Sequence, residues 1–462
     1  MIKSWIPKSI RRKLRKTYNS IKGFPSNETD KLQIRLITNR DSDNLGDQLI
    51  EECDISMIHA AMRNLGYHKE QYIINKSAAG IVSKKYLSTN DDSLLDEARK
   101  KIWNSDLVIF GGAPLFNYFY QEFYRRTIVS LEIAQEKNIP VLFSSIGVEQ
   151  YSETDPRCQN LKTALNLPCV KQITTRDDLE SLRQYIERKE ILIDRVADPA
   201  VFSDKVFEPF LAPEKRKGLI GLVVVRKGIF SDNQIKFSED EQIRFWLDTV
   251  EILKNEGYDY EFLTTGHFSD EVFLDNLCRN HDVSPAKCSI NINYPEDLID
   301  KISSYDGLIA YRLHAGIAAY ALGVPAIGLT WNQKVSMFYD AIGYSGRAFE
   351  SADWNGETIV SALKKAMEEG VKKDIEYCMS VYDTLFTSMK KVLKPDEEIR
   401  KHNYKTLIEN LSAYRGTTHH ARDNKLLRKF RRTYENYRKL EAMISSQKEE
   451  IGRLQKDGGE IQ

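Results

Sequence analysis

Cysteine is scarce in this chain of 462 residues, and its few cysteines are scattered without a C-x-x-C pair. The six positions are Cys53, Cys158, Cys169, Cys278, Cys288 and Cys378. In a chain of this length, that pattern argues against a disulfide-rich scaffold and against a structural zinc knuckle. We expect mostly buried, reduced thiols and a cytoplasmic location.

An excess of charge of either sign is also missing, because 67 Lys and Arg residues balance 67 Asp and Glu residues. No global field therefore marks a nucleic-acid binder. The balance hides an asymmetry, since residues 1–24 hold eight basic groups and no acidic one. Apolar side chains recur there every three or four residues, which predicts a basic amphipathic helix, followed by a linker that ends near residue 30. Such a helix can contact an anionic membrane surface or pack on the acidic body of the protein, and both interpretations remain open.

The first residues have no uninterrupted apolar core and no small-residue cleavage site, so they do not predict a secretory signal. The most apolar long stretch, residues 307–331, would be long enough to cross a bilayer. It contains Arg312, His314 and Pro325, however, and its ends resemble strands. We therefore predict a strand-helix-strand unit, in a protein that is cytoplasmic or peripheral at the inner face of the membrane.

Short strand-like runs alternate with helical segments through much of the chain. Between residues 31 and 205 we predict strands over 32–38, 71–75, 106–110, 141–145, 172–175 and 191–196, with helices over 48–65, 94–103 and 179–188. Between residues 215 and 393 we predict strands over 219–225, 260–264, 306–311 and 325–329, with helices over 239–255, 270–280 and 313–322. This alternation predicts two α/β, Rossmann-like domains with parallel sheets, joined through residues 202–217. A cleft should lie between them, beyond the carboxyl ends of the strands.

The alternation of strand-like and helical segments ends after residue 393. We predict a packing helix within residues 394–412, a loop over 413–424 that contains His419 and His420, and a charged helix over 425–456. The segment 413–462 is therefore a helical extension. Its apolar residues form a partial heptad pattern, broken at Glu441 and Lys448. A short coiled coil, a second basic membrane contact and a solvated helix all remain open. Adjacent histidines on a loop do not predict a metal site.

Several nucleotide and catalytic motifs are absent. The sequence has no G-x-x-x-x-G-K-[ST], G-x-G-x-x-G, H-E-x-x-H or G-x-S-x-G motif, and its one D-x-D, Asp41-Ser42-Asp43, begins three residues after the predicted strand 32–38 rather than at its end. A metal-bound nucleotide-sugar site therefore has no support. The remaining chemistry consists of arginine, histidine and helix N-termini, which predicts a metal-independent site for a small, multiply charged anion.

Two loops of the first domain could approach such an anion with their backbone. Asn44-Leu45-Gly46-Asp47 precedes a helix whose free N–H groups favour anions, and Asp47 could cap that helix. A capped helix start without a ligand explains this loop as well. Gly111 and Gly112 follow a strand, where they permit close approach of a ligand or simply a tight turn.

Two further loops carry charged side chains at strand ends. Arg176 lies within Thr175-Arg176-Asp177-Asp178, where it can bind a phosphate or carboxylate, or pair with Asp177 or Asp178. Arg312 and the backbone of Leu313 precede a helix rich in small residues and predict an anion site. His314 beside them can transfer a proton, unless it is a structural core histidine. His267 and Lys334 follow other strands of the second domain and could reach the same cleft, although a surface lysine is the ordinary interpretation.

Taken in order, these motifs resemble the polysaccharide pyruvyl transferase family, over roughly residues 32–346. The motifs that carry the resemblance are Asn44-Leu45-Gly46-Asp47, Gly111-Gly112, Arg176-Asp177, Arg312-Leu313-His314, Gly323-Val324-Pro325 and Lys334. One departure is Ala113, followed by Pro114, where the family usually has a third glycine. That change could alter acceptor choice or mark a relative with changed chemistry.

The resemblance implies two Rossmann-like halves arranged as in the B-type glycosyltransferases, with the acceptor on the N-terminal side and the donor on the C-terminal side. It implies transfer of pyruvate from phosphoenolpyruvate to two hydroxyls of a sugar, in a polysaccharide or its lipid-linked precursor, which gives a cyclic ketal. Arg176, Arg312 and His314 would bind phosphoenolpyruvate, with no cofactor, metal or nucleic acid required.

Two alternatives stay open on the residues alone. A nucleotide-sugar glycosyltransferase of the same architecture could use Asp270 or Glu271 to recognise its donor. A non-catalytic scaffold could use the terminal helices for membrane contact and for pairing into a homo-oligomer. The acceptor sugar and the oligomeric state do not follow from the sequence.

Overall fold

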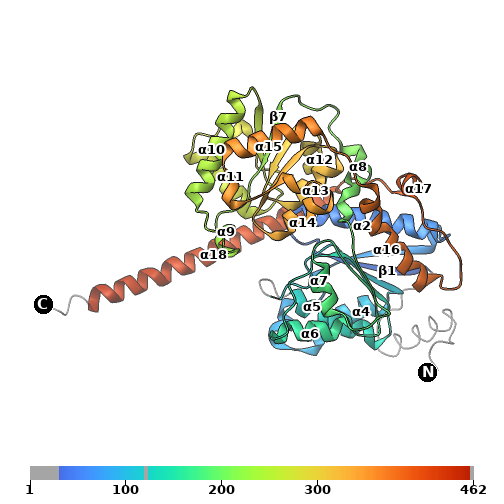
Figure 1. Ribbon diagram of the computed structural model, residues 1–462. Helices are drawn as coiled ribbons and strands as arrows, with labels where there is room; N and C mark the ends of the chain where they lie inside the picture. The colour runs from blue at the N-terminus through green and yellow to red at the C-terminus, as the bar shows by residue number, and fades with distance from the viewer. Residues whose placement is uncertain (1–30, 119–122, 458–462) are drawn as a thin grey trace. The chain divides into compact units, whose positions relative to one another are not determined.

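The computed structural model describes residues 31–118 and 123–457, which fall into two compact units that divide after Tyr414 (Figure 1). The basic amphipathic helix predicted over residues 1–24 lies outside the described residues. The larger unit holds two six-stranded parallel sheets, one in each α/β half. The predicted fold class is confirmed.

The sheet of the N-terminal half has the strand order β2-β1-β3-β4-β5-β6. Its strands are β1 (Leu32–Thr38), β2 (Tyr72–Ala78), β3 (Leu107–Gly111), β4 (Val141–Ile146), β5 (Val170–Thr175) and β6 (Leu192–Arg195). The connecting helices are α2 (Leu45–Asn64), α3 (Lys84–Thr89), α4 (Asp96–Trp103), α5 (Phe123–Glu136), α6 (Pro156–Leu165) and α7 (Leu179–Tyr185). Strands β3 and β4 are buried along their whole length, as expected for central strands of a parallel sheet with both faces covered.

The sheet of the C-terminal half has the order β12-β11-β10-β7-β8-β9. Its strands are β7 (Leu219–Val223), β8 (Asp259–Leu263), β9 (Cys288–Ser289), β10 (Gly307–Ala310), β11 (Ala326–Thr330) and β12 (Ala348–Glu350). Its main helices are α10 (Glu239–Asn255), α11 (Phe268–Asn280), α12 (Pro295–Ser303), α13 (Leu313–Ala321), α14 (Gln333–Ala341) and α15 (Gly356–Glu369). The edge strands β9 and β12 were not predicted, because two or three residues are too few to show a pattern.

The apolar stretch over residues 307–331 is the unit β10-α13-β11, so the strand-helix-strand prediction is confirmed. Among the described residues, no helix is both long enough and apolar enough to span a bilayer. The six cysteines are free thiols, and Cys53, Cys158, Cys169 and Cys378 are buried.

Helix α16 (Ile375–Leu393) follows the C-terminal half in sequence but packs on the N-terminal half, against α2 and strands β4, β5 and β6 (Figure 1). Its apolar side has fully buried Val381, Tyr382 and Leu385. A C-terminal domain that ends at residue 393, as predicted, would have kept this helix with the other half. Its own helical pattern does not reveal which half its apolar side covers.

The helix expected within residues 394–412 is shorter than predicted, since α17 covers only Tyr404–Asn410. It packs back on the body through α2, as expected: Leu407 is fully buried, and Ser412 N donates to Ser56 Oγ at 2.8 Å. The second unit contains α18 (His419–Asp457), so the predicted loop ends earlier than residue 424 and His419 and His420 lie in the helix.

Gly221 occupies the centre of β7, in register with Leu308 of β10 and Glu261 of β8. The ring of Tyr305 packs directly over it. A Cβ atom at position 221 would lie 2.5 Å from Tyr305 Cδ2 and 2.7 Å from Leu308 Cδ1. Both neighbours are fully buried, so neither can move aside freely.

We predict that Gly221→Ala lowers the free energy of unfolding by about 1–3 kcal/mol, because overpacking forces displacement of a buried ring. Gly346→Ala is the matched control, since a Cβ there meets nothing within 4 Å and its backbone is not in the left-handed region. Thermal and urea denaturation of both variants measure the difference. Equal stability of the two variants would contradict this account of Gly221.

Candidate active site

The loop that begins α2 reaches from the N-terminal half to the C-terminal half. Asn44 caps α2 by accepting a hydrogen bond from Gly46 N at 3.2 Å, so the cap is Asn44 and not Asp47 as predicted. Leu45 N donates to Thr265 O at 2.9 Å, and Thr265 Oγ1 lies 3.4 Å from Asn44 Oδ1. These bonds connect the first strand-end loop of one half to the loop after β8 in the other.

Two glycines allow the halves to come this close. A Cβ at Gly46 would collide with the imidazole of His314, which lies at the start of α13. A Cβ at Gly266, which has a φ of +82°, would lie 2.8 Å from Asp43 O. The glycine of the Asn44–Asp47 loop therefore makes room for the predicted catalytic histidine.

A buried carboxylate, Asp198, joins two of the predicted site residues. Arg176 Nη1 donates to Asp198 Oδ2 at 2.6 Å, and His314 Nε2 lies 3.8 Å from the same oxygen. Arg176 comes from the end of β5, Asp198 from the loop after β6, and His314 from the other half. The structure thus brings Arg176 and His314 together around one acidic group that the sequence analysis did not identify.

His314 is 8 % exposed. Burial, and next the charge of Arg176, lower its pKa to about 4, although Asp198 opposes the shift. The imidazole is therefore neutral near pH 7. In the described part of the chain, neither His314 Nε2 nor Arg176 Nε has a hydrogen-bond partner. These two buried nitrogen atoms are available to a ligand.

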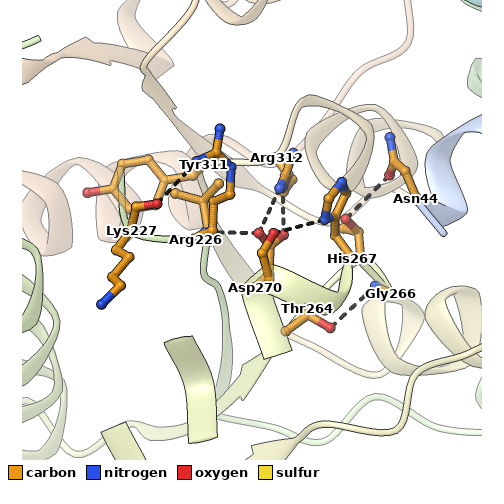
Figure 2. Close-up of polar contacts among 12 residues, drawn as sticks. Asn44, Arg226, Lys227, Thr264, Gly266, His267, Asp270, Tyr311 and Arg312 are labelled. Carbon is orange, nitrogen blue, oxygen red and sulfur yellow. Dashed lines mark hydrogen bonds and ion pairs between the residues drawn. The ribbon is translucent and has the colours of Figure 1, made fainter. Parts of the chain in front are cut away.

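The guanidinium of Arg312 forms an ion pair with a second carboxylate (Figure 2). Its Nε and Nη2 donate to the two oxygens of Asp270 at 2.8 and 2.7 Å, and Arg226 N donates to Asp270 Oδ1 at 2.9 Å. His267 is the N-cap residue of α11, but its side chain accepts no capping bond from the helix backbone; its Nδ1 instead lies 3.1 Å from Ser269 Oγ in the first turn. Burial, and next the charge of Arg312, lower the pKa of His267.

Lys334, at the start of α14, crosses to the N-terminal half, where its Nζ lies 3.5 Å from Asp177 Oδ2. Burial by itself would raise the pKa of Asp177, but Lys334 and Arg176 hold it below its ordinary value. Each predicted cation therefore has a buried carboxylate neighbour: Asp198 for Arg176, Asp270 for Arg312 and Asp177 for Lys334. The site is closer to electrical neutrality than a cluster of unpaired cations would be.

The glycine turn after β3 packs against α2, and its continuation reaches the cluster: Gly147 N donates to Ala113 O at 3.1 Å, and a Cβ at Gly147 would lie 3.3 Å from Pro114 Cα and 3.2 Å from Lys334 Nζ. Gly111 and Gly112 are buried, and added Cβ atoms would collide with Asp54 and Ile50 of α2. Their lack of side chains admits the helix, which is a packing reason. Neither oxygen of Asp54 has a hydrogen-bond partner among the described residues. Burial, and next the charge of Asp198, raise its pKa well above the ordinary value.

Two cavities adjoin the cluster. The smaller, about 10 Å³, is lined by Arg176, Asp198, Leu313, Lys334 and Tyr377, among others. That volume suits about one water molecule. The larger, about 650 Å³, lies between the halves and shares Asp177 and Lys334 with the smaller one. Its lining is mostly polar, with the indole of Trp331 held by a bond from Nε1 to Tyr311 O at 2.6 Å.

A comparison with protein families shows which family the chain belongs to. The family model described as polysaccharide pyruvyl transferase matches residues 6–333. This range includes Arg176, Asp198 and His314, ends one residue before Lys334 and leaves Tyr377 outside. The chain belongs to the polysaccharide pyruvyl transferase family. A search of curated protein sequences gives no significant match.

Solved structures share the architecture of this pyruvyl transferase family member at low sequence identity. A putative UDP-N-acetylglucosamine 2-epimerase from Listeria monocytogenes is 10 % identical, covers 80 % of this chain and 99 % of its own, and superposes with a TM-score of 0.53. The MnaA–UDP structure from S. aureus is 13 % identical over 80 % and 99 %, with a TM-score of 0.49. The ADP-heptose heptosyltransferase II of E. coli is 12 % identical over 73 % and 99 %, at 0.37. The Listeria match shows the fold alone, two Rossmann-like domains as in B-type glycosyltransferases.

Sequence reasoning missed three residues that line the candidate site: Asp198, Glu149 and Tyr377. The position of Asp198 could have indicated a site residue, because it follows the last strand of the first sheet, at the edge where the other strand-end loops lie. The position of Tyr377 could not, because it lies in helix α16 and not at a strand end. Among the described residues, no group of three or more His, Cys, Asp or Glu side chains is arranged to hold a metal ion.

Asp47 is 7 % exposed in the first turn of α2, and Asn39 Nδ2 donates to its Oδ2 at 2.9 Å. Burial raises its pKa from 3.8 to about 6, although Ser42 and Arg176 oppose the shift. The folded state therefore holds this proton more tightly than the unfolded state does. The associated stability is fully present below about pH 4 and is lost as the pH rises through about 6.

We predict that Asp47→Asn stabilises the fold at pH 8 by about 1–3 kcal/mol, because it removes the cost of ionising a buried carboxyl. The gain should shrink to nearly nothing at pH 4, where both side chains are neutral in the folded state. Melting temperatures of variant and wild type across this pH range measure it. A stability difference that does not change with pH would show that the ionisation of Asp47 is not responsible.

Proposed function

We propose that this pyruvyl transferase moves the pyruvyl group of phosphoenolpyruvate onto two hydroxyls of a sugar, in a polysaccharide or its lipid-linked precursor, and releases phosphate. The family match supports the reaction class. The convergence of Arg176 and His314 on Asp198, from opposite halves, is the observation that carries the donor assignment.

Phosphoenolpyruvate has a phosphate and a carboxylate and needs several cationic or N–H donors. Arg176 Nε and His314 Nε2 have no hydrogen-bond partner among the described residues. Lys334 lines the same small cavity as Arg176, and the N-terminus of α13 attracts negative charge. The smaller cavity is too small for the whole donor. Binding therefore requires the donor's anionic groups to replace carboxylates as partners of the cations, or the two halves to separate.

The reaction then follows from the residue types. C3 of phosphoenolpyruvate accepts a proton from the imidazolium of His314, which makes C2 electrophilic, and a sugar hydroxyl attacks C2 while its proton passes to the imidazole. The C2–O bond to phosphate breaks, and phosphate leaves with the bonding electrons. A neighbouring hydroxyl closes the ring on C2, and its proton leaves with the phosphate. Arginine and lysine stabilise the negative charge throughout, without a role for a divalent ion.

The larger cavity is the space that we assign to the acceptor sugar. Trp331 offers an apolar face there, and Glu149 offers a carboxylate whose Oε2 accepts from Asn117 Nδ2 at 3.1 Å. Burial, and next Asp177, raise the pKa of Glu149. Planar polar groups beside an aromatic ring suit a hydroxyl-rich ligand. Lys334 lines both cavities, which supports an acceptor position next to the proposed donor.

A donor screen tests the proposed function. Phosphoenolpyruvate should raise the melting temperature, whereas UDP and ADP should not, and EDTA should leave the shift unchanged. Incubation with phosphoenolpyruvate and a lipid-linked glycan extract should release phosphate. Stabilisation by a nucleoside diphosphate alone would instead favour a nucleotide-sugar glycosyltransferase of the same architecture. Membrane contact through residues 1–24 stays a prediction from the sequence.

We further predict that phosphoenolpyruvate binding takes up a proton at His314. The pKa of this histidine is about 4 in the free protein, and an adjacent trianion favours the imidazolium and raises it. Calorimetry at pH 6.5 in two buffers of different ionisation enthalpy measures the uptake. His314→Asn should abolish His314's contribution and lower kcat by about 10²–10⁴-fold, with the melting temperature preserved. The same proton uptake in wild type and variant would overturn the role of His314.

A further inference from the structure

Helix α18 has an apolar face without a described partner in its own unit. It spans 39 residues, and its described apolar side chains from Leu426 to Ile451 are about half exposed, between 47 and 61 %. These nine side chains are most of the eleven exposed large hydrophobic side chains in the part of the chain that the structure describes. Such concentration on one helix indicates a docking surface rather than scattered surface residues.

The exposed side chains follow a seven-residue repeat. Phe430, Tyr437, Ile444 and Ile451 are spaced exactly seven apart and take position a of a heptad, and Leu426 and Leu440 take position d. In this register Glu441 and Lys448 fall at position e, where charged residues are ordinary in coiled coils. Glu441 and Lys448 interrupt the seam only in a register that begins at Leu427; in the present register the polar seam residues are Thr433 and Gln447, both at position d.

The length of the helix suits a stable pairing. At 1.5 Å per residue, 39 residues extend about 58 Å, and the helix covers more than five heptads. A sustained pattern over three or four heptads is typical of a coiled coil. One helix by itself cannot bury the side chains at its a and d positions. A partner helix with the same pattern is needed to cover them.

The charge along α18 selects the orientation of that partner. Residues 422–439 contain eight basic and two acidic residues, whereas residues 440–457 contain three basic and four acidic ones. A parallel pair would place two strongly basic segments side by side, about 10 Å apart and only partly screened. An antiparallel pair places each basic segment beside a weakly acidic one.

We propose that α18 forms an antiparallel two-stranded coiled coil with α18 of a second copy of this chain. Its centre places Tyr437 against Leu440 of the partner subunit, and Ile444 lies opposite the partner's Thr433. An anionic membrane would attract only the basic segment. The repeat, however, continues through Ile444 and Ile451, in the segment without a basic excess.

The mass of the full-length protein in solution, measured by light scattering after size exclusion, tests the pairing. Wild type should have the mass of a dimer at 50 µM, and the double variant Leu440→Asp/Ile444→Asp should have the mass of a monomer. Ser445→Asp/Ser446→Asp is the matched control, because it adds the same two charges at positions b and c. The control should stay dimeric. A monomeric wild type, or a seam variant that remains dimeric, would overturn the proposal.

Cysteine cross-linking tests the orientation. In the antiparallel pair, position 430 faces position 447 of the partner, whereas in a parallel pair position 447 faces itself. Mixed Phe430→Cys and Gln447→Cys chains should therefore give a cross-linked dimer on denaturing gels, above the wild-type background. Gln447→Cys alone should not. Self-cross-linking at 447 would overturn the orientation. Binding of a monomeric wild type to phosphatidylglycerol vesicles, if Leu440→Asp/Ile444→Asp abolishes it, would assign this face to a membrane instead.

Discussion

The buried carboxylate of Asp198 is the group around which the two halves of this enzyme meet. It accepts a hydrogen bond from Arg176 of its own half and lies against His314 of the other. A carboxylate that is 1 % exposed is costly unless a cation neutralises it, so Arg176 cannot move away without a replacement. The glycines at positions 46 and 266 permit the two halves to meet, because a Cβ atom at either position would collide with the opposite half.

The pairing of each cation with a carboxylate explains how three cations can lie close together at a largely buried site. Three cations would repel one another if they were buried without partners, and each of them instead has a carboxylate neighbour. Under the proposed function, an anionic donor would exchange places with one of these carboxylates at modest electrostatic cost. The low pKa of His314 fits the same balance, since a neutral imidazole adds no further positive charge to the cluster.

Local signals predicted most of the architecture. Alternating strands and helices indicated both sheets, and α10 begins and ends where predicted, because Ser238 and Glu241 form a capping box at its start. The strand-end loops held the site residues, since all parallel strands end at one edge. Three features did not follow from local pattern. Asp198 lies 22 residues from Arg176. Helix α16 follows the C-terminal half but covers the N-terminal half. The proposed heptad register of α18 has polar residues at two of its seam positions, Thr433 and Gln447.

The main chain passes between the halves twice, once between β6 and β7 and again between α15 and α16. Two covalent crossings restrict rigid-body movement more than one does. The two halves also share one continuous buried core, which includes Met57 of α2, Leu298 of α12 and Ala318 of α13. Any widening of the space lined by Trp331 and Lys334 would therefore have to disturb packed side chains as well as bend the chain at the two crossings.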